Sequence, residues 1–168
     1  MDPRSPATPE ILGKQLQLGR QIFGETIEAR RALAEINSVQ KQISDAQAKL
    51  VGQERHADLR AALAESQSEI GKILASQDHS ANAAPGLQEA YNGLASSLRV
   101  VESGDRETPS QALAVYKESS RQVQARVEEW SDFKRARLPK LNERLRTAGA
   151  APIAISEIER LVEFLISR

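Results

Sequence analysis

Residues 9–51 read PEILGKQLQLGRQIFGETIEARRALAEINSVQKQISDAQAKLV, a segment with the apolar periodicity of one long helix. Its apolar side chains recur at steps of three and four, which places them on one helix face. Thr8 can cap the helix, and Pro9 suits the first turn because no backbone N–H is needed there. Gly52 follows, and glycine is the residue expected just past a helix end. At 1.5 Å per residue, the predicted helix is about 64 Å long.

The remainder of the chain contains four further helical segments, separated by short polar, glycine-containing or proline-containing connections. Short connections make successive helices antiparallel neighbours. We therefore predict an all-α fold, an antiparallel up-down-up-down four-helix bundle with two long outer helices, two short helices and a short C-terminal helix. The predicted ranges are 9–51 and 109–148 for the long helices, 54–76 and 85–103 for the short pair, and 156–166 for the last helix.

Pro139 lies inside the second long helix. Proline has no backbone N–H, and its ring crowds the carbonyl four residues earlier, which belongs to Arg135. We therefore expect a kink at this position.

The composition agrees with a helical chain and argues against several functions. Apolar residues make up 40% and aromatic residues only 4%, so Ala, Leu, Ile and Val must do most of the packing. The 23 Lys and Arg balance the 23 Asp and Glu, which argues against an electrostatic binder of nucleic acid. No segment approaches about 18 consecutive apolar residues, so we expect no membrane span. There is no cysteine, which excludes disulfides.

The first nine residues contain three of the seven prolines, a composition typical of a linker. Two interpretations stay open: a linker that joins the chain to a preceding domain, and an ordinary frayed terminus. We divide the chain into a linker at 1–8, a four-helix bundle at 9–153 and a C-terminal helical tail at 154–168.

The unequal helix lengths predict an exposed apolar surface. In an up-down bundle the short pair can cover only one end of the long pair, so 9–27 and 130–148 should project as a two-helix stalk. An exposed apolar pair of helices needs a cover. The candidates are the tail folded back, a second copy of the chain in a homodimer, or a neighbouring domain. The predicted contact surface consists of Leu16, Ile22, Phe23, Trp130, Phe133, Leu138 and Leu141.

The end of the helix 109–148 is basic. Such a patch could meet phosphates or an anionic membrane. The interpretation that we favour is a helix end whose cations complement the helix dipole and attract the acidic tail. The basic residues are Lys134, Arg135, Arg137, Lys140, Arg144 and Arg146, and the acidic tail residues are Glu157, Glu159 and Glu163.

No arrangement of residues indicates a metal site, a cofactor or a catalytic group. Helical bundles that hold two iron ions use Glu-x-x-His pairs. The only histidines, His56 and His79, follow Gln53 and Ser76 at that spacing. Nucleophile elbows, zinc-protease motifs and phosphate-binding glycine loops are missing as well. We therefore predict that the chain is not an enzyme and holds no cofactor or metal.

Three segments carry a family resemblance: LQLGRQI at 16–22, INSVQKQI at 36–43, and LNERL at 141–145 with Ala148-Gly149. Over roughly 12–153 the chain resembles the C-terminal helical region of bacterial sortilin-like proteins with BNR repeats, often labelled glycosyl hydrolases. The resemblance implies a β-propeller upstream and a periplasmic or extracellular location. Any glycosidase residues would lie outside this chain.

These features lead to two functional hypotheses. The first is a non-catalytic helical interaction module that docks against an upstream β-propeller domain or a second copy of the chain. The alternative is a ligand-sensing four-helix bundle like those of periplasmic sensors. It predicts a polar pocket near Ser66, Ser97 and Ser120, where serine interrupts the apolar stripes.

Overall fold

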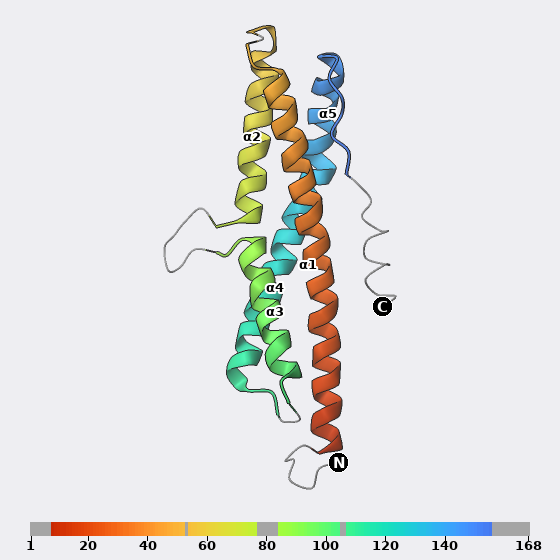
Figure 1. Ribbon diagram of the computed structural model, residues 1–168, viewed down its shortest axis with the longest axis vertical. Helices are drawn as coiled ribbons and strands as arrows, with labels where there is room; N and C mark the ends of the chain where they lie inside the picture. Colours follow the sequence, from red (N-terminus) through yellow and green to blue (C-terminus); the bar gives the residue numbers. More distant parts are fainter. Residues whose placement is uncertain (1–7, 53, 77–83, 105–106, 156–168) are drawn as a thin grey trace.

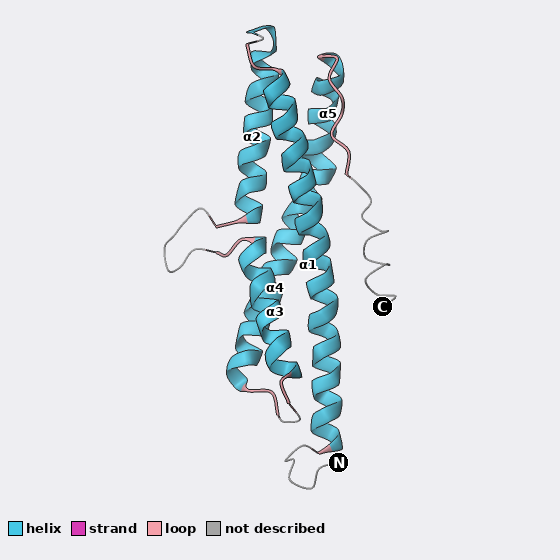
Figure 2. Cartoon of the chain, in the orientation of Figure 1, coloured by secondary structure: helices cyan, strands magenta, loops and turns pink. Residues whose placement is uncertain are grey.

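The computed structural model describes residues 8–52, 54–76, 84–104 and 107–155, and every regular element in these ranges is helical (Figures 1 and 2). The all-α prediction is confirmed. The predicted linker, apart from Thr8, and the predicted helix 156–166 lie outside the described residues, as does His79. The elements are α1 (Pro9–Lys49), a 3-10 turn (Glu54–His56), α2 (Ala57–Leu74), α3 (Leu87–Glu102), α4 (Ser110–Asp132), a π-helical turn (Phe133–Arg137) and α5 (Leu138–Thr147).

Helix α1 forms as its sequence predicts and runs the length of the molecule (Figure 1). Thr8 Oγ1 accepts a hydrogen bond from the backbone N–H of Ile11 at 3.3 Å, which satisfies one unpaired donor of the first turn. The helix ends at Lys49, and Gly52 takes a φ of +77° in the turn that follows.

Helices α2 and α3 follow one another along α1 instead of packing side by side (Figure 1). Gly86, just before α3, lies against the end of α2. A Cβ added there would come within 2.6 Å of Ala75 N and of the Leu74 carbonyl oxygen. The two short helices therefore form one interrupted rod, and they are not the antiparallel neighbours that we expected.

The two long helices also run parallel to each other, whereas we expected them to be antiparallel. Glu25 on α1 contacts Tyr116 on α4, and Glu35 contacts Trp130 and Lys134 further along both. Contacts that advance together along two helices mean that α1 and α4 run parallel, whereas the up-down-up-down order requires antiparallel ones. The physical reason is coverage, since two short helices placed end to end cover both halves of the long ones.

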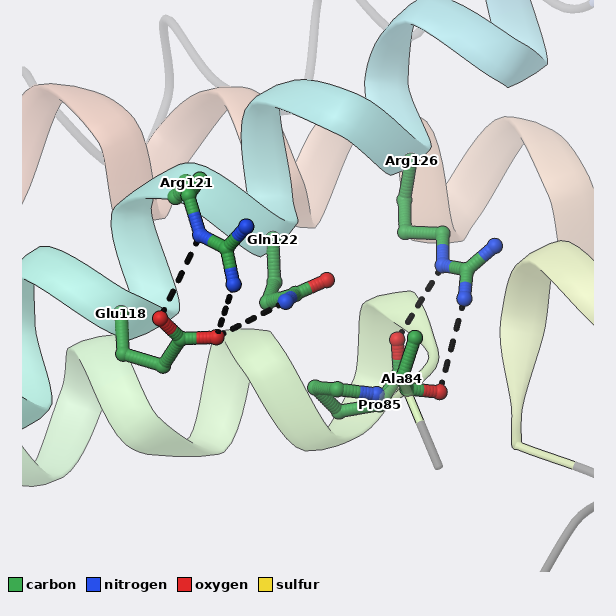
Figure 3. Close-up of polar contacts among 6 residues, drawn as sticks. All are labelled: Ala84, Pro85, Glu118, Arg121, Gln122 and Arg126. Carbon is green, nitrogen blue, oxygen red and sulfur yellow. Dashed lines mark hydrogen bonds and ion pairs between the residues drawn. The ribbon is translucent and has the colours of Figure 1, made fainter. Parts of the chain in front are cut away.

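The start of α3 is fastened to α4 by one arginine (Figure 3). Arg126 Nε donates to the Pro85 carbonyl oxygen at 3.1 Å, and Nη2 donates to that of Ala84 at 3.5 Å. Glu129 pairs with the same guanidinium at 2.8 Å. The side chain of Arg126 therefore fixes where the chain enters the second half of the interrupted rod.

The expected disturbance at Pro139 takes the form of a π-helical turn, after which the helix continues as α5. Pro139 cannot donate to Arg135, and the preceding Leu138 N–H donates five residues back, to the Phe133 carbonyl oxygen. One extra residue in this turn accommodates the proline without ending the helix.

Candidate interaction surfaces

The predicted contact surface is largely wrong, because five of its seven residues are core. The side chains of Leu16 and Phe23 are 57% and 52% exposed. The projecting stalk does not exist, since α2 covers one half of the long helices and α3 lies along the other half (Figure 1). The buried five are Ile22, Trp130, Phe133, Leu138 and Leu141.

Trp130 is the centre of a polar junction between α1 and α4. Its indole N–H donates to Glu35 Oε2 at 2.8 Å, and Lys134 Nζ donates to the same oxygen at 2.8 Å. The Lys134 ammonium lies 5.7 Å from the Trp130 ring centroid, and Phe133 stacks on that ring at 5.5 Å. These residues hold the two helices together and are not available to a partner.

Half of the predicted basic patch is neutralised within the chain. Besides Lys134 with Glu35, Arg135 pairs with Asp132, and Arg137 pairs with Glu69 at 2.7 Å. The other three residues are Lys140, Arg144 and Arg146, all exposed on α5. The pairing reduces the positive field that a phosphate or an anionic surface would meet. The acidic tail residues proposed to cover this patch lie outside the described residues.

The two exposed apolar residues of α1 border a groove against the end of α3. This α1/α3 groove has a volume of about 440 Å³. Gln15 crosses its end and donates to the carbonyl oxygens of Val101 and, at 2.8 Å, Gly104. Val101 belongs to the last turn of α3, where helical carbonyls lack partners of their own, and Gly104 follows the end of the helix. The groove is lined by Leu12, Gln15, Leu16, Gly19, Arg20 and Phe23 of α1 and by Val101, Glu102 and Gly104.

A second polar contact, between Tyr116 and Glu25, joins α4 to α1. The Tyr116 hydroxyl donates to Glu25 Oε1 at 2.9 Å. Burial raises the pKa of Tyr116 above its ordinary value, and the neighbouring Glu25 carboxylate raises it further. The phenol therefore stays protonated at neutral pH and serves as a hydrogen-bond donor between helices.

The serines expected to line one ligand pocket are buried but do not come together. Ser66 lies on α2, whereas Ser97 and Ser120 lie in the half of the molecule that α3 and α4 form. Ser97 Oγ donates to the Gly93 carbonyl oxygen of its own helix at 3.0 Å. A Cβ on Gly93 would collide with Ser119 of α4. Small residues here permit close packing of α3 on α4. Gly93 is one of them, and it was not among the residues predicted from the sequence.

A pair of amide side chains that was not predicted from the sequence holds the segment after α5. Asn142 Nδ2 donates to the Ile153 carbonyl oxygen at 2.9 Å, and Asn142 Oδ1 accepts from the Ile153 N–H at 2.8 Å. Gln42 on α1 binds Ala154 in the same way, at 2.7 and 2.9 Å. We call Gln42 and Asn142 the amide clamp. Nothing in the apolar periodicity marks these two residues, because both lie beside the stripes.

Within the described ranges, no three His, Asp or Glu side chains gather as a group able to hold a metal ion. Nor does any helix in this part of the chain have the length and apolar character to cross a membrane. No protein family, curated protein or solved structure matches the chain. The proposed function therefore rests on the exposed residues and contacts of the described surfaces.

Proposed function

We propose that the chain is a non-catalytic helical interaction module that binds its partner through the α1/α3 groove. The observation that carries the proposal is the exposure of Leu16 and Phe23 beside a groove with an apolar floor. Both side chains lie on α1, seven residues apart and therefore on one face. Large apolar side chains grouped at a hollow are typical of protein contact sites, and aromatic anchors dominate binding energy there.

Gly19 adds a geometric argument. It lies between Leu16 and Phe23 on α1 and brings no side chain to the groove, and an added Cβ would lie 3.8 Å from Val101 Cγ1 of α3. The backbone of α1 and the Val101 side chain therefore meet at this point, with Leu16 and Phe23 on either side of Gly19. This arrangement suits the binding of an apolar helix face in a groove.

The proposed partner is an upstream β-propeller of a sortilin-like protein, or else a second copy of the chain. The groove begins at Leu12, within the first turn of α1. A domain preceding α1 would join the chain at the same end of α1 as the groove. On this proposal the protein is exported, and any glycosidase activity belongs to the propeller.

The test is a Phe23→Asp substitution, with Val115→Asp as its matched control. Val115 is 42% exposed on α4 and lies outside the groove. Sedimentation equilibrium from micromolar to millimolar concentration measures self-association, and titration with any propeller encoded upstream measures the second partner. The proposal expects Phe23→Asp to weaken one of these associations at least tenfold while Val115→Asp leaves it unchanged. Monomers in every case, together with no propeller binding, would refute it.

A further inference from the structure

The segment after α5 is bound as a strand would be, although no second strand is present in the described residues. Helix α5 ends with the Ala150 N–H donating to the Leu145 carbonyl oxygen at 2.8 Å, and Gly149 takes a φ of +72°. The chain then turns back and lies extended beside α5 (Figure 1). Its residues Ile153 and Ala154 bridge α5 and α1 through the amide clamp.

The amide clamp binds the backbone N–H and C=O groups of the segment. In an extended chain the N–H and C=O of one residue point to one side, and those of the next residue point to the other. Asn142 binds both groups of Ile153, and Gln42 binds both groups of Ala154. Four hydrogen bonds therefore depend on the extended conformation and on no side chain of the bound segment. Ile153, 4% exposed, is also anchored by its side chain, and the partly buried Ala150 and Ile155 pack against the core as well.

The bound segment fits its site incompletely. A hollow of about 340 Å³ remains between residues 149–153 and residues 42–50, at the end of α1. Ala150 and Ala151, whose side chains are single methyl groups, line one wall of this hollow, and Asp45, Ala46, Lys49 and Leu50 line the other. Larger side chains at the two alanine positions would bury more apolar surface there.

We propose that this seam between α1 and α5 is a binding site for an extended peptide, which the chain fills with its own residues 150–155. The ligand is an extended segment of another protein with an aliphatic residue at the position of Ile153 and side chains larger than alanine at those of Ala150 and Ala151. Main-chain hydrogen bonds would supply affinity, and the two side-chain positions would supply selectivity, as when a peptide is added to a sheet edge. The chain's own segment acts as a tethered competitor.

The experiment uses the full chain and a fluorescein-labelled peptide, Gly-Leu-Leu-Pro-Ile-Ala-Ile. Ile153→Asp should release the chain's own segment because it buries a charge, and peptide affinity should then rise roughly tenfold or more over wild type. Val115→Asp is the matched control, since Val115 is 42% exposed on α4 and does not line the seam. It should bind peptide as weakly as wild type does. Fluorescence anisotropy measures all three.

Two further changes locate the site. Adding Asn142→Ala to Ile153→Asp should remove the gain in affinity, and so should replacing the isoleucine at the fifth position of the peptide with aspartate. Equal affinity of wild type and Ile153→Asp, or a gain that survives Asn142→Ala, would overturn the proposal.

Ala154→Pro is a second variant, used if Ile153→Asp fails to fold. It removes the N–H that donates to Gln42 Oε1 and restricts the backbone of residues 153 and 154, but it buries no charge. Circular dichroism reports the helix content of each variant. If Ile153→Asp loses helix, Ala154→Pro takes its place with the same expected gain in affinity. Loss of helix in both variants that the peptide does not restore would also overturn the proposal.

Discussion

Trp130 and Glu35 form the central link between the two long helices: the indole N–H of a fully buried tryptophan on α4 donates to a carboxylate on α1 at 2.8 Å. The same carboxylate oxygen accepts from Lys134. A buried indole N–H without an acceptor is costly, so Glu35 determines whether Trp130 can occupy the core. This link fixes the parallel register of α1 and α4.

Glu35→Ala should lower the free energy of unfolding by about 1–3 kcal/mol, because it leaves the Trp130 N–H without its acceptor and Lys134 without its anion. Urea denaturation followed by circular dichroism measures the loss. Glu35→Gln should cost less, since an amide oxygen can still accept from the indole. Glu28→Ala, an exposed glutamate on the same helix, should stay within about 0.5 kcal/mol of wild type. Equal stability of Glu35→Ala and Glu28→Ala would contradict the role given to this link.

Gly86→Ala should destabilise the chain by about 1–3 kcal/mol, because its Cβ would meet backbone atoms of Ala75 and Leu74 that cannot rotate away. The same substitution at Gly24, where an added Cβ meets nothing within 4 Å, should instead stabilise the helix by about 0.5–1 kcal/mol. Thermal unfolding of the two variants compares them directly. A neutral Gly86→Ala would mean that α2 and α3 do not abut.

Arg126→Ala should lower the free energy of unfolding by about 1–2 kcal/mol, because the carbonyl groups of Pro85 and Ala84 lose their charged donor. Arg121→Ala is the matched control. That arginine is exposed and pairs only locally with Glu118 in the described structure, so its loss should change stability by less than about 0.5 kcal/mol (Figure 3). Chemical denaturation measures the free energy of unfolding of both variants. Similar losses would show that Arg126 does not fix the start of α3.

Tyr116 should ionise above its ordinary pKa of 10.0, because burial and then the Glu25 carboxylate raise its pKa. The folded chain holds this proton more tightly than the unfolded chain. The resulting stability is therefore complete below about pH 10 and is lost as pH rises through the folded pKa. Absorbance at the tyrosinate band, in a Tyr91→Phe background so that Tyr116 alone reports, measures the midpoint. Glu25→Gln should lower the midpoint only in part, since burial is the larger cause, and a full return to 10.0 would show that it is not.

The helices themselves could be predicted closely, because their signals are local. Thr8 and Pro9 start α1, and Gly52 follows its end, so the predicted 9–51 differs from Pro9–Lys49 by two residues. The disturbance at Pro139 could be foreseen for the same reason, since a missing N–H acts on its own helix. The candidate site was harder to predict from the sequence than the helices were. Leu16 and Phe23 are indistinguishable by type from the buried Ile22, and only the position of α3 separates them.

The amino-acid order was enough to predict that this protein is helical, which face of each helix is apolar, and roughly where the helices of the described ranges begin and end. Those properties follow from hydrogen bonds and periodicities that span only a few residues. The tertiary structure alone decided that α2 and α3 lie end to end and that α1 and α4 run parallel. An apolar stripe is buried equally well by either order of helices, and the choice depends on contacts between residues far apart in the chain, such as Gly86 against Ala75 and Trp130 with Glu35.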